Sequence, residues 1–221
     1  MVYVVFDGPS GGGKTTVAKE LVERFNAAYF SQPTPPFDRL RPDLREMLYN
    51  RGDVMTVTLT FFASDANAAS IAKRCNGIVD RFLPSHVVLG ALCMNHLTNC
   101  KESLDDVYSD LLSIAEVIAR YIPHPALIAL FLPRREVALE RMERRGYMSR
   151  LDRIELEHYD WVTRRVEEAC DILFPHTQTM EIDNSDQTPE ETIELLLPEL
   201  ERVFCRKLAN LTLKGKTKLP R

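Results

Sequence analysis

The sequence predicts an α/β fold built on a parallel, doubly wound sheet of about five strands. Two observations predict it. Short apolar runs with the character of buried strands alternate along the 221 residues with longer, amphipathic segments. The first apolar run, 2–6, leads through a glycine-rich stretch, 8–13, directly into a helical pattern. Right-handed crossovers between parallel strands put helices on both faces of the sheet, so we expect three layers in the order αβα.

Short apolar runs bounded by turn residues are predicted as strands. They cover residues 2–6, 27–30, 77–80, 126–132 and 177–182. Segments with apolar residues at helical spacing are predicted as helices, and they cover residues 16–25, 38–49, 54–74, 103–121, 136–145, 152–169 and 188–208. Residues 56–60 also have strand propensity, which competes with the helix there. The last helix begins at a capping box of Thr188 and Glu191, with Pro189 in the first helical position.

Residues 8–15 fit G-x-x-x-x-G-K-[ST], the phosphate-binding pattern of the P-loop NTPases. Glycines let backbone N–H groups converge on phosphate oxygens, and the start of the following helix adds partial positive charge. We therefore predict a P-loop NTPase sandwich that binds a nucleoside triphosphate with Mg²⁺. Lys14 is expected to reach the β- and γ-phosphates, and the Thr15 hydroxyl to ligate Mg²⁺. The residues predicted to bind the triphosphate in this loop are Gly8, Ser10, Gly11, Gly12, Gly13, Lys14, Thr15 and Thr16.

Asp80 and Arg81 end the predicted strand 77–80. Functional groups of open α/β sheets collect at the carboxyl ends of strands, beside the phosphate-binding loop. An acid there holds Mg²⁺ directly or through water, and an arginine binds phosphate bidentately. The alternative is an exposed pair of charges at a strand end.

Arginines concentrate around Gly146, where one predicted helix ends and the next begins. They are Arg141, Arg144, Arg145, Arg150 and Arg153. Movable arginines that close over a transferring phosphoryl group stabilise its charge and exclude water. The alternative is a solvated helix face paired with nearby glutamates. Because the arginines are densest at the break, we predict a lid over about 144–153.

Together these motifs resemble the thymidylate kinase family of nucleoside monophosphate kinases. The matching residues are Phe6-Asp7-Gly8, Gly13-Lys14-Thr15-Thr16, Phe61-Phe62-Ala63-Ser64-Asp65, Asp80-Arg81-Phe82 with Ser85, Glu136 to Arg141, Arg144-Arg145, and Asp152-Arg153-Ile154-Glu155. The resemblance implies transfer of the γ-phosphoryl group of Mg·ATP to a (deoxy)nucleoside monophosphate. It also implies a homodimer.

The resemblance assigns roles to individual positions. Lys14 and Thr15 would serve ATP and Mg²⁺, with Asp80 near the metal. The acceptor phosphate would bind Arg81, and the acceptor base would stack on Phe62. Arg145 and Arg153 would hold the transferring group. Further expected contacts are Arg141 for ATP and Asp7, Arg45 and Ser85 for the acceptor.

The acceptor side departs from the family's pattern at several positions. Ser10 stands where the family has an acid facing the acceptor sugar, and Ala66 where it has an arginine that reads thymine. The family's R-E-P appears as Ser31-Gln32-Pro33, which removes a phosphate contact that Arg39, Arg41 or Arg45 would have to replace. Base specificity therefore stays open.

Two other functions remain open. The first is a kinase of a nucleoside or another small-molecule hydroxyl, with Asp80 or Asp7 as general base. The second is a regulatory ATPase or switch without an acceptor, which would need no lid.

Composition limits the class of protein. A net charge of −4 argues against a protein that coats nucleic acid, so we expect no stable nucleic-acid partner. No apolar run approaches the roughly 20 residues that cross a bilayer, so we expect no membrane span. Five cysteines without a C-x-x-C pattern suggest reduced thiols and a cytoplasmic location. We expect one domain over 1–210 and a flexible basic tail over 211–221.

Overall fold

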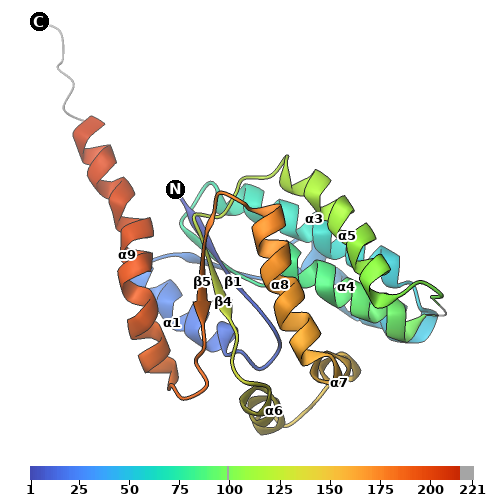
Figure 1. Cartoon of the computed structure of the whole chain (residues 1–221). Coiled ribbons are helices and arrows are strands. Elements are labelled where there is room, and N and C mark those ends of the chain that lie inside the picture. The colour runs from blue at the N-terminus through green and yellow to red at the C-terminus, as the bar shows by residue number, and fades with distance from the viewer. Residues whose placement is uncertain (99, 215–221) are drawn as a thin grey trace, which may run out of the picture.

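The computed structural model describes residues 1–98 and 100–214 and confirms the predicted α/β class (Figure 1). One sheet has five strands, all parallel, in the order β2-β3-β1-β4-β5. The strands are β1 (Tyr3–Asp7), β2 (Ala28–Ser31), β3 (Gly77–Asp80), β4 (Leu127–Phe131) and β5 (Gln178–Ile182). Each strand corresponds to a predicted one, with its ends shifted by at most about one residue, as is usual for element boundaries.

Helices lie on both sides of the sheet, which makes the three expected layers (Figure 1). One layer contains α1 (Lys14–Phe25) and α9 (Pro189–Lys214), and the other contains α3 (Val54–Ala72), α4 (Leu83–Leu97), α5 (Leu104–Ala119) and α8 (Tyr159–Leu173). The side chains of β1 alternate between the two layers, as the period of two requires. Val4 and Phe6 pack with α1 and α9, and Tyr3 and Val5 pack with the other layer.

Helix α4 has no counterpart among the predicted elements. It packs against α3, α5 and α8, and most of its residues are buried. A helix enclosed in this way carries apolar residues around its whole circumference, so the one-sided spacing that marks a surface helix is absent. It begins at Leu83, just after the predicted site residues Asp80 and Arg81.

Two predicted helical regions differ in detail from the structure. The region predicted at 38–49 consists of a 3₁₀ turn (Phe37–Leu40), α2 (Arg41–Glu46) and a π-helical turn (Met47–Arg51). The helix predicted at 152–169 is two helices, α7 (Arg150–Glu157) and α8, which meet at His158, where φ is −110° and ψ is 24°. Helix α6 (Arg135–Arg144) precedes the turn at Gly146. Residues 56–60 lie inside α3 despite their strand propensity.

Helix α9 extends past residue 210, after which the tail was predicted to begin. Helix α9 begins at the predicted capping box, in which Glu191 N donates to Thr188 Oγ at 3.2 Å and Thr188 N donates to Glu191 Oε2 at 2.8 Å. It continues to Lys214, so residues 211–214 belong to the helix. Residues 215–221 of the predicted tail lie outside the described residues.

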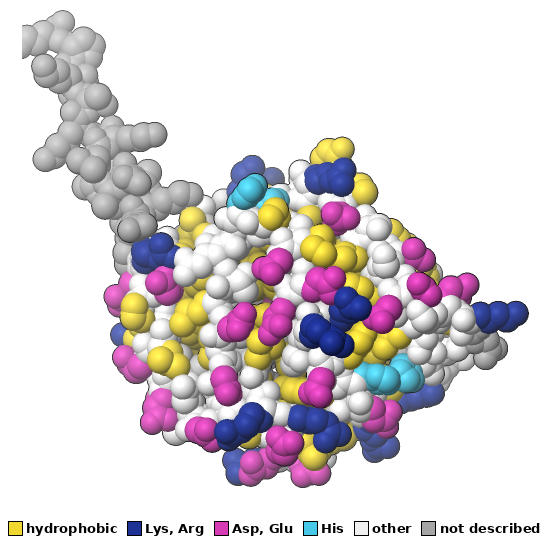
Figure 2. Space-filling model, viewed as in Figure 1, with side chains coloured by type: hydrophobic (Ala, Val, Ile, Leu, Met, Phe, Trp, Pro, Cys, Tyr) yellow, Lys and Arg dark blue, Asp and Glu magenta, His cyan; other side chains and the backbone are white. Residues whose placement is uncertain are grey.

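Acidic and basic side chains are interspersed over the face of the molecule in Figure 2, which shows no continuous basic surface on that side. Within residues 1–98 and 100–214, no helix has the length and apolar character needed to span a membrane. The cysteines whose side chains are described are free thiols, namely Cys75, Cys93, Cys100 and Cys170.

Candidate functional site

A cavity of about 1360 Å³ lies at the carboxyl ends of the strands, and the loop 8–13 forms one of its ends. Its other end is more apolar and is lined by residues of α3 and α4, among them Val57, Phe61 and Leu89. The predicted site residues that line it are Ser10, Gly11, Gly12, Gly13, Lys14, Thr15, Thr16, Arg45, Asp80, Arg81, Arg141 and Arg145. Residues predicted from separate motifs are thus brought together around one space.

The glycine loop is held tightly against its neighbours. Gly8 has φ +117°, and a Cβ there would lie 2.3 Å from the carbonyl oxygen of Phe131. Gly11 has φ +78°, and a Cβ there would lie 2.4 Å from the carbonyl oxygen of Ala138. Both positions require glycine, for conformation and for space. Gly8 does not line the cavity itself but shapes the loop that does.

Lys14 lies under the loop as the first residue of α1. Its ammonium group donates hydrogen bonds to the carbonyl oxygens of Gly8 at 2.8 Å and of Pro9 at 2.6 Å. Burial, reinforced by the positive charge of Arg81, lowers the pKa of Lys14 to about 8, although nearby carboxylates oppose the shift. The Lys14 side chain is thus a buried cation held by two carbonyl oxygens of the loop that is predicted to bind phosphate.

Thr15 and Asp80 form an oxygen pair beside this lysine. The Thr15 hydroxyl donates to Asp80 Oδ2 at 2.5 Å, and the Tyr29 hydroxyl donates to the same oxygen at 2.7 Å. Hydroxyl and carboxylate oxygens are ligands that Mg²⁺ prefers, so the donor set fits this ion. Among the described residues no group of three or more His, Cys, Asp or Glu side chains could hold a metal. An ion bound here would therefore take water and phosphate oxygens as its remaining ligands, as Mg²⁺ commonly does.

Arg141 and Asn184 brace the loop from its outer side. Arg141 donates to Asn184 Oδ1 at 3.0 Å and to the Asn184 carbonyl oxygen at 2.7 Å. Asn184 Nδ2 in turn donates to the carbonyl oxygen of Gly12 at 3.0 Å. Asn184 was not predicted from the sequence. Its position just after β5, at the carboxyl end of a strand, was the signal that would have indicated it.

Arg81 is held in an unusual backbone conformation, with φ +70°. Its Nη2 donates to the hydroxyl of Ser10 at 2.8 Å. Its Nη1 is shielded from solvent and has no hydrogen-bond partner among the described residues. A guanidinium nitrogen left unpaired in this way is costly unless a ligand completes its bonding, and phosphate oxygens match its geometry.

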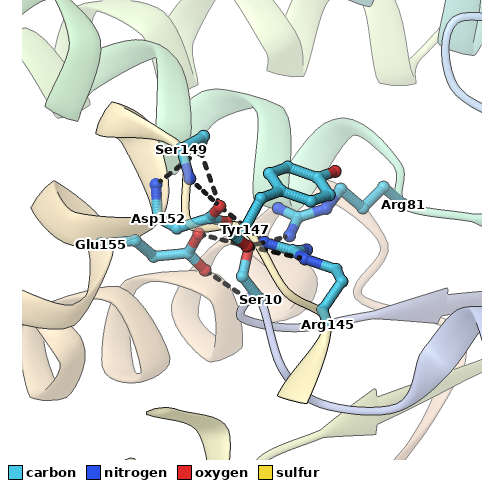
Figure 3. A network of polar contacts seen from close by, with 7 residues as sticks. All are labelled: Ser10, Arg81, Arg145, Tyr147, Ser149, Asp152 and Glu155. Carbon is cyan, nitrogen blue, oxygen red and sulfur yellow. Dashed lines mark hydrogen bonds and ion pairs between the residues drawn. The ribbon is translucent and has the colours of Figure 1, made fainter. Parts of the chain in front are cut away.

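Glu155 of α7 connects the lid to the glycine loop (Figure 3). Its carboxylate accepts hydrogen bonds from Ser10 N at 2.5 Å and from Ser10 Oγ at 2.7 Å. The side chain is buried and lines the cavity. A carboxylate is thus present next to loop position 10, although the loop itself has a serine there.

Arg145 belongs to a second set of contacts within the lid (Figure 3). It donates to Asp152 Oδ2 at 2.7 Å, and its guanidinium carbon lies 4.5 Å from the centre of the Tyr147 ring. Burial raises the pKa of Asp152, but hydrogen bonds from Ser149 and the charge of Arg145 outweigh this, and the net shift is downward. The segment predicted as a lid therefore includes the turn between α6 and α7, and two of its arginines, Arg144 and Arg145, line the cavity.

Arg153 does not share this position. Its side chain is exposed on α7 and does not line the cavity, in contrast to the role implied for it. Successive residues of a helix point about 100° apart, so Asp152 faces the lid contacts while Arg153 turns toward solvent. Of the two arginines expected to hold the transferring group, Arg145 lines the cavity and Arg153 does not.

Three acceptor-side predictions are also corrected. Phe62 is 1% exposed and packs in the core, so it offers no face to a base. Its neighbour Phe61 lines the cavity instead, because adjacent positions of α3 point in different directions. Asp7 and Ser85 are both buried outside the cavity lining, and the Ser85 hydroxyl donates to Asp7 Oδ1. Burial raises the pKa of Asp7, and this pair is part of the core beneath the site.

Arginines of the segment after β2 lie where a replacement phosphate contact was expected. Arg41 and Arg45 both line the cavity, whereas Arg39 does not. Arg41 donates to the carbonyl oxygen of Gln32 at 2.8 Å. Arg45 is exposed on α2 and makes no hydrogen bond or ion pair with a described residue.

The comparison with curated sequences gives a partial match. A protein from Methanococcus vannielii named "Probable thymidylate kinase" is 29% identical over 91 residues. The match covers 39% of this chain and 45% of that protein, so the chain spans less than half of the relative's length. No protein-family model matches the chain.

Solved structures match over most of the chain. A thymidylate kinase from Candida albicans has a TM-score of 0.69 at 17% identity, and the match covers 91% of each chain. A deoxyadenosine kinase from M. mycoides with bound dATP has a TM-score of 0.64 at 16% identity, over 90% of this chain and 100% of that one. These likenesses confirm the predicted fold. The resemblance to thymidylate kinase that the motifs indicated is confirmed over part of the sequence and in the fold.

Proposed function

We propose that this thymidylate kinase-like protein is an ATP-dependent phosphotransferase that moves the γ-phosphoryl group of Mg·ATP to a (deoxy)nucleoside monophosphate. The observation that carries the proposal is the environment of Arg81. Its guanidinium lies in the same cavity as the phosphate-binding loop, and Nη1 has no partner among the described residues. An acceptor that brings its own phosphate would complete the bonding of this group.

The chain's own residues divide the work between two ends of the cavity. At the loop, backbone N–H groups and Lys14 bind the phosphates, and Thr15 and Asp80 are the oxygens available to Mg²⁺. When bound, Mg·ATP supplies the phosphoryl group and neutralises part of its charge. Beside the loop Arg81 positions the acceptor phosphate, and at the other end Phe61 offers an aromatic face to the acceptor base. Catalysis by such an arrangement is mainly positioning and charge stabilisation.

The lid contributes the remaining positive charge. Gly11 carries no cation at its position in the loop, and Arg145 lines the cavity from the segment between α6 and α7. The ion pair with Asp152 holds the Arg145 guanidinium next to the loop. Arg has five N–H donors, so others remain to bind a phosphoryl oxygen. Closure of the α6–α7 turn would exclude water from the transferring group.

One observation favours a second candidate, a kinase of a nucleoside hydroxyl. Such an enzyme needs a general base within reach of the acceptor. Asp7 is buried away from the cavity, so it does not fit this role, but the Glu155 carboxylate lines the cavity between Ser10 and the lid. The unpaired nitrogen of Arg81 would have no acceptor phosphate to bind in this case, which is why we place this candidate second.

The experiment that tests the proposal measures ADP release from ATP alone and from ATP with a panel of deoxynucleoside monophosphates and the matching nucleosides. We expect monophosphates to stimulate ADP release and nucleosides to have little effect. Stimulation by nucleosides alone would favour the second candidate. ADP release that no acceptor changes would favour a regulatory ATPase and contradict the proposal.

A variant of the loop lysine is the control for this assay. Lys14→Ala should lower the stimulated rate by at least about 100-fold, because a cation at the transferring phosphates stabilises the transition state. Circular dichroism and the thermal midpoint show whether the fold is kept. A folded Lys14→Ala variant with activity within about tenfold of wild type would contradict the loop assignment.

A further inference from the structure

A buried histidine–carboxyl pair lies at the apolar end of the cavity, on the helices α3 and α4. His86 Nδ1 is 2.7 Å from Asp65 Oδ2, and the two side chains are 6% and 0% exposed. The two residues are 21 positions apart in the chain, and none of the site motifs described above combines them. Burying two polar side chains costs free energy unless their hydrogen-bonding groups are satisfied.

His86 is placed to face a ligand. It lines the cavity, and its ring lies 4.7 Å from that of Phe61, with an angle of 33° between the planes. Asp65 occupies Nδ1, and nothing among the described residues hydrogen-bonds Nε2. The charged groups that act on the ring are Arg81 and Asp7. Both rings therefore border the part of the cavity that is open to a base.

The position of the protons decides whether Nε2 donates or accepts. Asp65 Oδ1 is buried and has no hydrogen-bond partner among the described residues, so an ionised carboxylate would leave charge on an unsolvated oxygen. Burial, reinforced by the charge of Asp7, raises the pKa of Asp65 well above its usual value. Burial also lowers the pKa of His86 to about 3. Burial therefore favours the neutral form of both groups.

A neutral pair has one well-satisfied arrangement. A proton on Oδ1 would be a buried donor without an acceptor in the described part of the chain. In a neutral pair the proton would therefore lie on Asp65 Oδ2 and be donated to His86 Nδ1. The imidazole then carries its own hydrogen on Nε2, which turns the ring into a hydrogen-bond donor toward the cavity.

We propose that Asp65 and His86 form a base-reading pair, in which His86 Nε2–H donates a hydrogen bond to a ring carbonyl oxygen of an acceptor base lying against Phe61. The inference rests on the proposed function, because it names the class of acceptor for that site. The class is a nucleotide with an oxo group at the reading edge, such as a 4-oxopyrimidine or a 6-oxopurine. A base with an amino group at that position would place its N–H donors opposite the Nε2–H donor of His86, and it would therefore bind less well.

The first test measures the tautomer of His86 in the wild-type protein without nucleotide. Two-dimensional ¹⁵N–¹H spectra of protein labelled with ¹⁵N-histidine distinguish a protonated Nε2 from a protonated Nδ1. His86→Phe identifies the signal and keeps an aromatic ring beside Phe61, and His86→Gln serves the same purpose if the phenylalanine variant does not fold. A protonated Nε2 is the expected result. A protonated Nδ1 would overturn the proposal.

The second test compares dUMP with dCMP, a pair that differs in the oxo or amino group at C4. We expect the wild type to prefer dUMP at least about tenfold, in kcat/KM and in binding measured without ATP. The preference should fall below about threefold in His86→Phe and His86→Gln, because phenylalanine has no donor and an amide can rotate to serve either base. His176→Phe is the matched control, since His176 is exposed and outside the cavity lining, and it should keep the preference.

A preference for dCMP, or one that His86→Phe and His86→Gln leave unchanged, would overturn the proposal. These outcomes are distinct from a failure of the proposed function. Absence of turnover with every acceptor would count against that function, while the tautomer and the binding preference, both measured without ATP, would still decide the role of His86.

Discussion

The carboxylate of Glu155 accepts hydrogen bonds from both the backbone N–H and the hydroxyl of Ser10, at 2.5 and 2.7 Å (Figure 3). One residue belongs to the lid helix α7 and the other to the glycine loop, 145 positions earlier in the chain. The same Ser10 hydroxyl accepts a bond from Arg81 at 2.8 Å. The predicted lid, the glycine loop and Arg81 therefore meet at one serine.

Removal of the Glu155 carboxylate should loosen the lid. Hydrogen bonds to a charged group each contribute about 1.5–3 kcal/mol, so their loss in Glu155→Ala should raise the population of the open lid by about tenfold or more. Limited trypsin digestion measures this, because Arg144, Arg145 and Arg150 lie in the lid. Glu157→Ala removes an exposed carboxylate from the same helix and should leave cleavage unchanged. Equal cleavage rates for the two variants would contradict a link between lid and loop.

The ionisation of Lys14 should appear in the pH dependence of ATP binding. Its pKa is lowered to about 8, so the free protein loses this positive charge as the pH rises through 8. The affinity for ATP should therefore weaken between about pH 7 and pH 9.5. Lys14→Arg keeps its charge over this range and should show a flatter profile, whatever its affinity. Calorimetric titration at several pH values measures both. A wild-type profile as flat as that of the arginine variant would count against Lys14 as the titrating group.

The two lid arginines should differ in their effect on catalysis. Arg145 lines the cavity, so Arg145→Ala should lower kcat by about 10- to 1,000-fold, as expected for a contact made in the transition state. Arg153 is exposed outside the cavity, so Arg153→Ala should stay within about twofold of wild type. Steady-state kinetics with saturating acceptor measure both. Equal losses in the two variants would show that the lid closes in a way that brings Arg153 inward.

Asp80 should set the concentration of Mg²⁺ that the reaction needs. Asp80→Asn removes the negative charge from the oxygen pair with Thr15 while keeping the size of the side chain. The Mg²⁺ concentration for half-maximal activity should rise by about tenfold or more, since hard cations prefer charged oxygen ligands. Asp43→Asn, at an exposed carboxylate of α2, is the control and should not shift it. An unchanged Mg²⁺ requirement in Asp80→Asn would remove Asp80 from the metal site.

The strands and the loop were predictable because each has a local cause. The run 2–6 is continuous and apolar since β1 is buried on both faces, and Gly8 and Gly11 occupy positions where a Cβ would collide with backbone. Lys14, Thr15 and Asp80 follow from the loop pattern and from the end of β3. Their mutual placement then follows from the parallel sheet itself.

The acceptor side was less predictable because it depends on the direction in which each helical side chain points and on contacts between residues distant in sequence. Phe61 and Phe62 look equivalent in the sequence, but they differ by one step of the helix, and only Phe61 faces the cavity. The pair Asp65 and His86 is formed by two helices, one of which, α4, has no amphipathic signal. Helix type can be read from spacing, but the neighbour that a buried polar side chain will meet cannot.

The positive φ of Arg81 puts two demands on one position. A left-handed backbone suits glycine and costs about 1–3 kcal/mol when a longer residue adopts it. The substitution Arg81→Gly would relax the chain and remove the guanidinium from the cavity. A library selected only for heat resistance should therefore enrich Arg81→Gly among inactive survivors, whereas a library selected for growth on its activity should retain the arginine. At position 81, selection for stability would therefore favour glycine, and selection for activity would favour arginine.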